Sequence, residues 1–208
     1  MKGLSREVLI DAGLKLLDEV GLDGLTVRRL ATAVGVQSPA LYWHFKTKQD
    51  LLDGMASAII QRAGMGPPRD GEEWPDWLRR RARAYRKSLL AHRDGARLIT
   101  SARRAPDALH DFERELAAMV ERGFTPAGAL LTIMTIADYT NGFVLQEQAT
   151  TGPPGEAEVT ALAQLPTLIA ALSSEGYRHP DESFEHGLSV LVAGTASVLR
   201  EVRTPRTS

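Results

Sequence analysis

The stretch GVQSPALYWHFKTKQDLL, residues 35–52, places four consecutive rings, Tyr42 to Phe45, directly before two closely spaced lysines. A buried helix would exclude the lysines, and a fully solvated helix would not carry four rings in a row. Because Leu41 and Phe45 are four residues apart, they share a helix face and are predicted to pack inward. The other rings are then split between core and surface, next to positive charge, which indicates a surface that contacts a partner.

Composition sets the broad class of the protein. The chain has 208 residues, 43% of them hydrophobic and 25% charged, with a net charge of -1, as in ordinary globular proteins. It has no cysteine, which excludes disulfides and thiolate metal sites and fits a reducing compartment. No signal peptide is recognisable at the start, and the longest apolar run is about half of a bilayer span. We expect a soluble, cytoplasmic protein that does not enter a membrane.

Helical periodicity dominates the chain, and no sustained alternation of the kind that predicts strands is found. An all-α fold is therefore expected. Each helix near the N-terminus has a capping residue at its start or a glycine at its end. These signals lie at Ser5, Gly21, Thr26, Gly35, Ser38-Pro39 and Thr47 with Asp50.

A change of composition predicts two domains. Residues 64–73 are rich in glycine, proline and charge and have the composition of a linker. Helices are expected on the far side of it, and the helix 47–62 would connect the two domains. The prediction is a three-helix N-terminal domain, 1–46, and a larger helical domain, 47–208. Helices of the larger domain are predicted at 74–91, 106–122, 125–150, within 158–174 with an interruption at Pro166, and 181–202.

Two short helices joined at Gly35 are typical of a helix-turn-helix, with residues 38–44 as the recognition helix. Once Leu41 and Phe45 turn inward, short side chains are left on the outside. Short side chains let a helix backbone approach base edges, and apolar groups such as the methyl of Ala40 suit contact with a thymine methyl. The outward residues are Ser38, Pro39, Ala40 and Tyr42.

The charge pattern supports DNA as the partner. Residues 24–48 contain four arginines and lysines and no aspartate or glutamate, and phosphates attract such local positive charge. Arg28 can reach a guanine, while Tyr42, His44 and Lys48 have the reach and the donors for phosphates. The alternative interpretation is a three-helix core with a few surface cations.

Residues 21–53, GLDGLTVRRLATAVGVQSPALYWHFKTKQDLLD, closely resemble the DNA-binding domain of the tetracycline repressor (TetR) family. LYWH followed by K.K..LL is particularly similar to the Tet repressors. The likeness continues in LLAHRDGARL (89–98), GFTPAGAL (123–130) and TNGFVLQEQ (140–148), so it covers most of the chain. The resemblance implies a homodimeric repressor whose head enters the major groove and whose core dimerises and binds an effector.

The same resemblance implies a role for each matching position of the head. Ser38 replaces a glutamine of the Tet repressors and Ala40 replaces a threonine, so a different operator is expected. Loss of the glutamine removes a bidentate adenine reader. The implied base-contacting residues are Arg28, Ser38, Pro39, Ala40 and Tyr42, and the implied backbone-contacting residues are Val27, Trp43, His44 and Lys48.

The implied effector pocket departs from the Tet repressors, whose inducer is a drug–magnesium complex. The two drug-binding positions are here Gly64 and Arg81. The two metal-side positions are Ile99 and Gln146, beside Glu147. Mg²⁺ prefers oxygen ligands with at least one carboxylate, and isoleucine supplies none. We therefore predict an effector other than magnesium-tetracycline, with no metal and no cofactor.

The predicted pocket is mostly apolar with a few polar groups, as is usual for small-molecule sites. An aromatic or polycyclic effector is expected. The alternative for Arg81 is a solvated position within an arginine-rich helix face, whereas Asp138 is favoured because a carboxylate is costly to bury without a partner. The predicted lining is Tyr85, Ile99, Phe112, Leu130 and Ile133, with Arg81, Arg103, Glu115, Asp138 and Gln146 as polar groups.

Residues 187–199 are apolar on nearly all sides and must be covered all round. Covering by a second copy predicts a four-helix homodimer interface from helices near 126–150 and 181–202. The alternative is a central helix of one monomer. The five histidines form no metal pair with a glutamate, and no G-x-S-x-G motif occurs, so an enzyme is not expected. A co-repressor-dependent or activating regulator remains the other interpretation.

Overall fold

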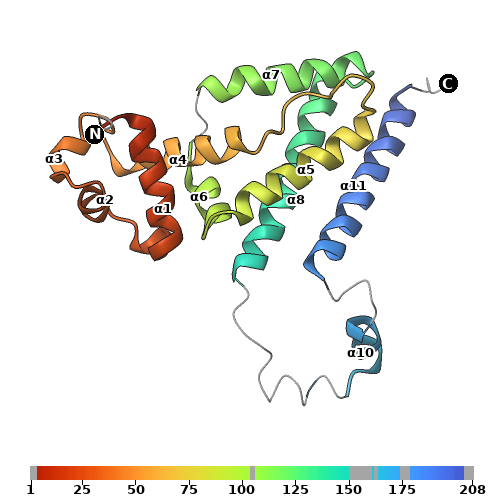
Figure 1. The fold of residues 1–208 in the computed structure, drawn as a ribbon. Coiled ribbons are helices and arrows are strands. Elements are labelled where there is room, and N and C mark those ends of the chain that lie inside the picture. Colours follow the sequence, from red (N-terminus) through yellow and green to blue (C-terminus); the bar gives the residue numbers. More distant parts are fainter. Residues whose placement is uncertain (1–3, 104–105, 150–160, 162–163, 174–178, 204–208) are drawn as a thin grey trace. The chain divides into compact units, whose positions relative to one another are not determined.

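The computed structural model describes residues 4–103, 106–149, 161, 164–173 and 179–203. These residues form α-helices and no strand (Figure 1), so the predicted all-α fold class is confirmed. They belong to two compact units, Met1–Gln148 and Ala149–Ser208, which are described one after the other.

Three helices, α1 (Arg6–Gly24), α2 (Val27–Ala33) and α3 (Ser38–Leu41), form a small head at the start of the first unit. We use "head" for residues 6–45. The predicted caps of α1 and α2 are confirmed, since Ser5 Oγ accepts from Val8 N at 3.3 Å and Thr26 Oγ1 accepts from Arg29 N at 3.2 Å. Gly21, with φ 72°, kinks α1 rather than ending it.

The third helix is shorter than predicted, because it ends at Leu41 and continues only as turns to residue 45. Its N-cap is Gln37, which makes no side-chain cap bond. The prediction that the Ser38 oxygen caps this helix is therefore wrong, since Ser38 already lies inside it. Leu41 and Phe45 are buried, as predicted, and both belong to the hydrophobic core of the unit.

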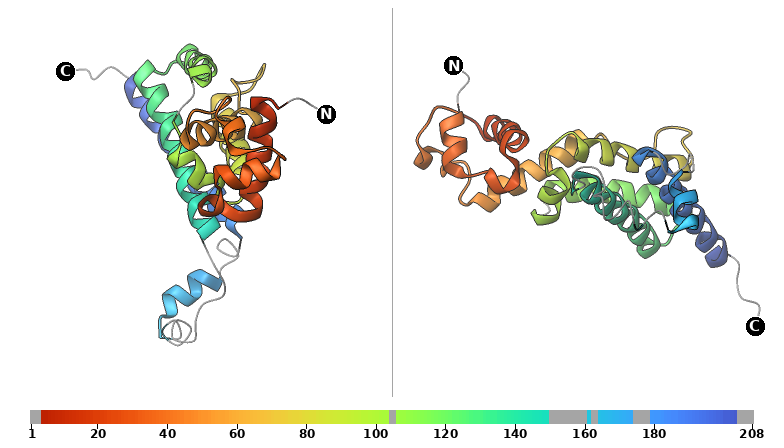
Figure 2. Two further views of the ribbon diagram at one scale, coloured as in Figure 1. Left: turned by 90° about the vertical axis from the view of Figure 1, so that its left-hand side faces the viewer. Right: turned by 90° about the horizontal axis from the view of Figure 1, so that it is seen from below.

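Helix α4 (Lys48–Arg62) begins with the predicted capping box. Asp50 N donates to Thr47 Oγ1 and Thr47 N donates to Asp50 Oδ2, both at 3.0 Å. Its apolar face packs on α1, where Gly13 leaves room for the sulfur of Met55. An ion pair between Arg62 and Asp11 adds a polar contact. The views in Figure 2 agree that α4 leads away from the head toward the later helices.

Four further helices of the first unit form the body, which we define as residues 74–148. They are α5 (Trp74–Leu90), α6 (Gly95–Ser101), α7 (Pro106–Glu121) and α8 (Pro126–Ala149). The periodicity did not predict the seven-residue α6. A Cβ at Gly95 would lie 2.3 Å from the Leu89 carbonyl oxygen, so the tight turn into α6 requires glycine at this position.

The glycine- and proline-rich linker is held against α5 by hydrogen bonds. Trp77 Nε1 donates to Gly66 O at 2.9 Å, and Arg80 Nη1 donates to Met65 O at 2.8 Å. Arg80 also forms an ion pair with Glu72 at 2.7 Å. Composition alone predicted a linker, but these bonds give it a fixed path.

The second unit contains α10 (Pro166–Ser173) and α11 (Pro180–Arg203). Pro166 begins α10, whereas it was predicted to interrupt a helix there, because proline suits the first turn and lacks the amide proton needed inside a helix. Most of residues 158–163 lie outside the described residues. The observed α11 agrees with the predicted helix 181–202 within two residues.

Among the described helices, α8 is long and apolar enough to cross a membrane, and 28% of that apolar window is buried. Leu131 and Met134 are exposed along it, Leu131 by 65%. The core helix of a globular protein meets the same criterion. An apolar face of this helix is therefore open to a partner.

Candidate nucleic-acid interface and ligand site

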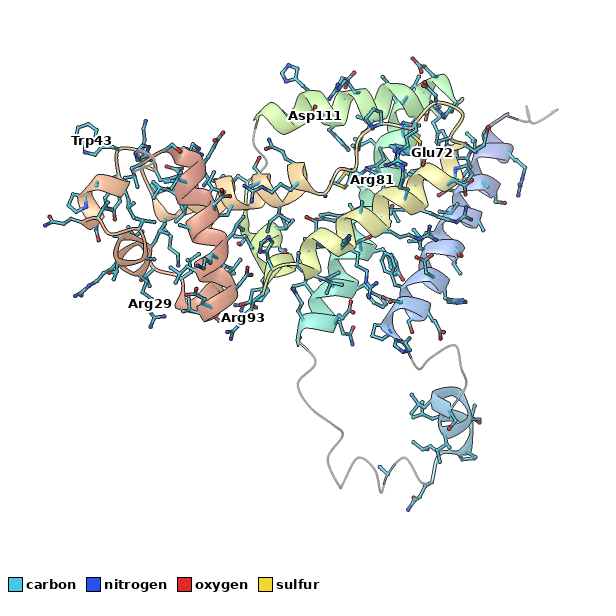
Figure 3. All side chains as sticks on the ribbon, viewed as in Figure 1. Arg29, Trp43, Glu72, Arg81, Arg93 and Asp111 are labelled. Carbon is cyan, nitrogen blue, oxygen red and sulfur yellow. The ribbon has the colours of Figure 1, made fainter. Side chains whose placement is uncertain are left out.

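The outer surface of the head carries the aromatic and short side chains that the sequence placed there. Trp43 is 91% exposed and Tyr42 is 53% exposed, and Figure 3 shows Trp43 at the outer edge of the head. Pro39 is also exposed, while Ser38, Ala40 and His44 are half-buried. A surface with two exposed rings beside small residues suits contact with base edges and sugar–phosphate chains.

The turn after α3 is held from behind. Arg6 Nη1 donates to the His44 carbonyl at 3.2 Å, and its guanidinium lies 4.5 Å from the centre of the Phe45 ring. Phe45 is thereby fixed in the core while Tyr42 and Trp43 point away. Sequence patterning missed this role of Arg6, because its partners are 38 and 39 residues further along the chain.

Positive charge surrounds this face. Arg28, Lys46 and Lys48 are exposed and form no ion pair with a described residue. Arg29 differs, because its Nη1 donates to the Gly24 carbonyl at 3.0 Å and so supports the turn between α1 and α2. Val27 is half-buried at the start of α2. Three cations are therefore available for phosphates within this part of the head.

In the body, Arg81 on α5 and Glu115 on α7 form a buried ion pair. Arg81 Nε donates to Glu115 Oε2 at 2.8 Å, and only 9% and 7% of the two side chains are exposed. Figure 3 shows Arg81 on α5, among the side chains beneath α7. The interpretation of Arg81 as a solvated helix position is therefore wrong. Burial raises the pKa of the Glu115 carboxyl, and the charge and hydrogen bond of Arg81 oppose that rise.

The neighbouring arginine behaves differently. The hydrogen bond from Arg80 lowers the pKa of Glu72 to about 2, against the smaller opposing effect of burial. Two adjacent arginines of α5 thus serve different purposes. Arg80 fixes the linker, while Arg81 points into the interior.

The other predicted lining residues divide by burial. Tyr85 and Ile133 are buried, and Ile99, Phe112 and Leu130 are half-buried. Asp138 is exposed on α8, so the argument from the cost of burying its carboxylate does not apply. Arg103 and Gln146 are exposed as well. The buried and half-buried residues lie on α5, α6, α7 and α8, whereas Asp138, Arg103 and Gln146 are exposed on the surface of this chain.

The residues at the metal positions do not fit Mg²⁺. Ile99 has no ligand atom, and Gln146 carries an exposed amide. The adjacent carboxylate of Glu147 is engaged by Arg86, whose Nη2 donates to its two oxygens at 2.8 and 3.1 Å. Within the described residues, no group of three His, Asp or Glu could hold a metal ion.

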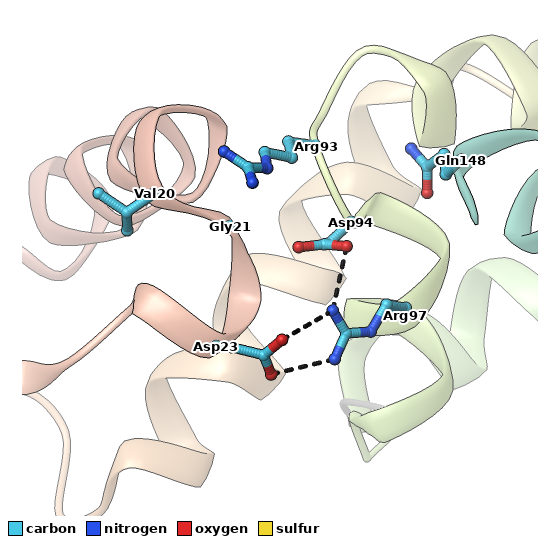
Figure 4. Close-up of a pocket in the computed structure, with 7 residues that line it drawn as sticks. All are labelled: Val20, Gly21, Asp23, Arg93, Asp94, Arg97 and Gln148. Atoms are coloured by element: carbon cyan, nitrogen blue, oxygen red, sulfur yellow. Dashed lines mark hydrogen bonds and ion pairs between the residues drawn. The ribbon is translucent and has the colours of Figure 1, made fainter. Parts of the chain in front are cut away.

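A separate polar cavity of about 370 Å³ lies where the head meets the body (Figure 4). None of its residues was predicted as functional, although the sequence LLAHRDGARL contains three of them. The cavity is lined by Val20, Gly21, Asp23, Arg93, Asp94, Arg97 and Gln148.

Comparison with known proteins agrees with this geometry. Residues 9–55 match the model for bacterial regulatory proteins of the tetR family, and residues 67–199 match the tetracyclin repressor-like C-terminal domain. The chain is 41% identical to the tetracycline repressor protein class A from transposon 1721 of Escherichia coli, with 99% of this chain and 98% of that protein covered.

Solved structures show the same fold. A TetR variant from Acinetobacter baumannii AYE in complex with minocycline superposes with a TM-score of 0.77 at 33% identity, covering 94% of this chain and 98% of that one. BioQ with its double-stranded DNA operator has a TM-score of 0.67 at 28% identity, covering 93% and 99%. A helix-turn-helix head on a larger helical body defines a class of transcriptional regulators. Within that class, the chain belongs to the tetR family.

Proposed function

We propose that the chain represses transcription by binding a palindromic operator as a homodimer, and that a small-molecule effector releases it. The observation that carries this proposal is the exposed face around Tyr42 and Trp43, bordered by three cations. In this proposal residues 1–46 form the DNA-binding domain and residues 47–208 form the effector-binding and dimerisation domain. The helix 47–62 connects them.

Each predicted DNA-binding residue of the head has a proposed role in the complex. The short residues of α3 and the reach of Arg28 suit base edges, while exposed rings and lysines suit phosphates. BioQ, a relative of the same fold, has been solved with its DNA operator. The proposed base contacts are Arg28, Ser38, Pro39, Ala40 and Tyr42, and the proposed backbone contacts are Val27, Trp43, His44 and Lys48.

The effector site is proposed between α5, α7 and α8. The Arg81–Glu115 pair supplies its polar end, and Tyr85, Phe112 and Ile133 supply apolar and aromatic walls. A relative has been solved in complex with minocycline. The lack of a ligand atom in Ile99 and the pairing of Glu147 with Arg86 argue against a magnesium ion here. We infer an aromatic or polycyclic effector that needs no metal ion. In the dimer, the exposed Asp138, Arg103 and Gln146 complete the rim of the site.

A second copy of the chain is the proposed cover for the apolar faces of α8 and α11. Leu131 and Met134 are exposed on α8, and Val190 and Val198 are exposed on α11, the last two by 57% and 61%. Long apolar helices that are exposed in one subunit are expected to form an isologous four-helix interface. The same cover explains the apolar length of α8 without a membrane.

In the proposed switch, effector binding in the body shifts α4 and moves the two heads away from successive major grooves, which are about 34–36 Å apart. A coupling of a few kcal/mol is sufficient, because each 1.4 kcal/mol changes affinity about tenfold. A co-repressor would act through the same elements with the opposite sign. We propose release rather than recruitment because the relatives with high identity are repressors.

Gel shifts with the DNA that flanks the chain's own gene test the regulatory function. We expect binding in the nanomolar range that weakens as salt is raised. Tyr42→Ala and Lys48→Ala are expected to weaken binding, whereas Lys87→Ala, an exposed lysine on α5, serves as the matched control. If the protein binds none of the palindromes in the flanking DNA, the proposed repressor function is wrong.

A thermal-shift screen tests the effector site. Aromatic metabolites and antibiotics are added to the full-length protein, with tetracycline tested with and without magnesium. We expect stabilisation by a metal-independent aromatic compound, reduced at least several-fold in affinity by Arg81→Met. Magnesium-dependent binding of tetracycline would show that the pocket argument is wrong.

A further inference from the structure

The turn between α5 and α6, together with the start of α6, is hydrogen-bonded to the end of α1. Asp94 Oδ2 accepts from Leu22 N at 2.8 Å, and Arg97 donates to both oxygens of Asp23 at 3.0 and 3.2 Å. Asp18 Oδ1 accepts from Arg93 N at 3.0 Å. We call this set the α1 latch: Arg93, Asp94 and Arg97 of the body with Asp18, Leu22 and Asp23 of the head. Its contacts join residues more than 70 positions apart.

The α1 latch depends on the kink at Gly21. With φ 72° at Gly21, the helical hydrogen-bond ladder is interrupted, and the amide of Leu22 is free to donate elsewhere. Asp94 accepts that amide much as an N-cap side chain does. A Cβ on Gly21 would lie 2.9 Å from Asp94 Oδ2. The kink and the carboxylate therefore fit only while residue 21 is glycine.

On the body side, the turn that carries the latch is held by hydrogen bonds to α8. Asp94 is the one non-glycine residue with positive φ, 56°, among the described residues. Gln148 of α8 donates to the His92 carbonyl at 2.8 Å and accepts from Ala96 N at 3.3 Å. A residue in a strained backbone conformation persists only where its surroundings hold it in place, and Gln148 holds this turn on both sides of Asp94. The turn can therefore fix the position of α1.

The two attachments of the head differ in chemistry. The packing of α1 on α4 is apolar and involves buried residues such as Leu9 and Met55. The α1 latch is charged and borders the 370 Å³ polar cavity, where Figure 4 shows Arg97 between Asp23 and Asp94. The hydrogen bond from Arg97 lowers the pKa of Asp23, so this pair stays ionised. The α1 latch adds polar contacts between the head and the turn before α6 to this apolar packing.

We propose that Asp94 and Arg97 are positioning residues for operator recognition, which hold the head at the angle that sets the spacing between the two recognition helices of the dimer. They do not contact DNA. Their effect reaches α3 through the shared core of the head, in which Leu17, Leu30 and Leu41 are buried together. This inference rests on the proposed function.

Operators of altered spacing test the proposal. The palindrome protected by the wild-type protein next to its own gene is prepared with its natural spacing and with one or two base pairs added or removed between the half-sites. Each added base pair turns one half-site by about 35° relative to the other, since B-DNA has about 10 base pairs per turn. Wild-type protein should prefer the natural spacing by tenfold or more.

For the variants Asp94→Ala and Arg97→Ala, we expect a flattened spacing profile. Affinity for the natural operator should fall about tenfold, while affinity for a single half-site stays unchanged. A residue that merely stabilised the fold would lower binding to every duplex equally. Arg114→Ala, which breaks the exposed pair with Asp111 on α7 at 2.6 Å, is the matched control and should retain the wild-type profile.

A second measurement needs no DNA. Because the chain has no cysteine, Lys15→Cys on the exposed side of α1 places one spin label in each subunit. Pulsed electron resonance then gives the distance between the two heads. We expect a narrow distribution in the otherwise wild-type dimer and in the Arg114→Ala control, and a broader one in the latch variants.

The outcomes separate the two proposals. Wild-type protein that ignores every flanking palindrome refutes the proposed function, while the label distances still test the latch. Latch variants that keep both the spacing preference and the narrow distance distribution overturn the inference, even if the wild-type protein binds its operator as proposed.

Discussion

The buried Arg81–Glu115 pair gives the sharpest prediction about stability. Glu115→Leu leaves a guanidinium whose side chain is only 9% exposed without its carboxylate at 2.8 Å. With an effective dielectric constant of about 20, charges about 4 Å apart attract by roughly 4 kcal/mol. Removing one partner of a buried pair typically costs about 3–5 kcal/mol, because the remaining charge stays desolvated. We expect a loss in this range.

The double variant Arg81→Met/Glu115→Leu should recover most of that loss and come within about 1–2 kcal/mol of the wild type, because no charge is then buried. Burial raises the pKa of Glu115 although Arg81 opposes that rise, as expected where a carboxylate is costly to keep charged. The single variant Arg81→Met should be less costly than Glu115→Leu, since a carboxyl can take up a proton whereas a guanidinium cannot lose one.

Urea unfolding followed by circular dichroism measures these free energies, at one fixed protomer concentration because dimer stability depends on concentration. The control is Arg114→Ala, which removes an exposed pair and should change stability by less than about 1 kcal/mol. A Glu115→Leu loss as small as that of the control would show that the pair is solvated. Strictly additive single and double losses would show that the two residues do not interact.

Three further predictions concern single positions. Gly95→Ala should destabilise the protein by more than about 3 kcal/mol in the same urea assay, because the new Cβ meets the Leu89 carbonyl oxygen at 2.3 Å; a neutral effect would mean that the turn rearranges freely. The pKa of Glu72 is lowered from 4.5 to about 2, so its ion pair with Arg80 stabilises the fold above pH 4.5, and this stabilisation is lost as pH falls toward 2. Glu72→Gln should flatten the dependence of the unfolding free energy on pH in this range, and an unchanged dependence would contradict the pairing with Arg80. Trp43→Ala should change the free energy of unfolding by no more than about 0.5 kcal/mol, as is usual for exposed sites, but should weaken operator binding. Unchanged binding in gel shifts would show that Trp43 does not contact DNA.

Local patterns in the sequence were sufficient to predict the starts of α1, α2 and α4. Ser5, Thr26 and the Thr47–Asp50 box cap the helices that they were predicted to cap, because capping involves residues only three positions apart. The spacing of Leu41 and Phe45 placed both in the core for the same local reason. Charge and ring content then identified the outer face, and the resemblance to the TetR family identified the class.

Local patterns could not predict helices that are short or that lack a capping side chain. Helix α6 has seven residues and begins after a strained Asp94, so its periodicity is too brief to detect. Serine is a common capping residue, and a cap at Ser38 would start the helix at Pro39. The helix instead begins at Ser38 itself, because Pro39 fits the first turn in either register. The exposure of Asp138 likewise depends on which face of α8 the other helices cover.

By itself the sequence determined features that depend on neighbours within one or two helical turns: the all-α class, the caps of α1, α2 and α4, the inward and outward faces of the head and its positive charge. Only the tertiary structure decided which charges meet. Arg81 faces Glu115 across 34 residues, and Asp94 reaches the amide of Leu22 across 72. Such pairs are set by how whole helices pack, since a side chain's partner across the core is independent of its neighbours in the chain.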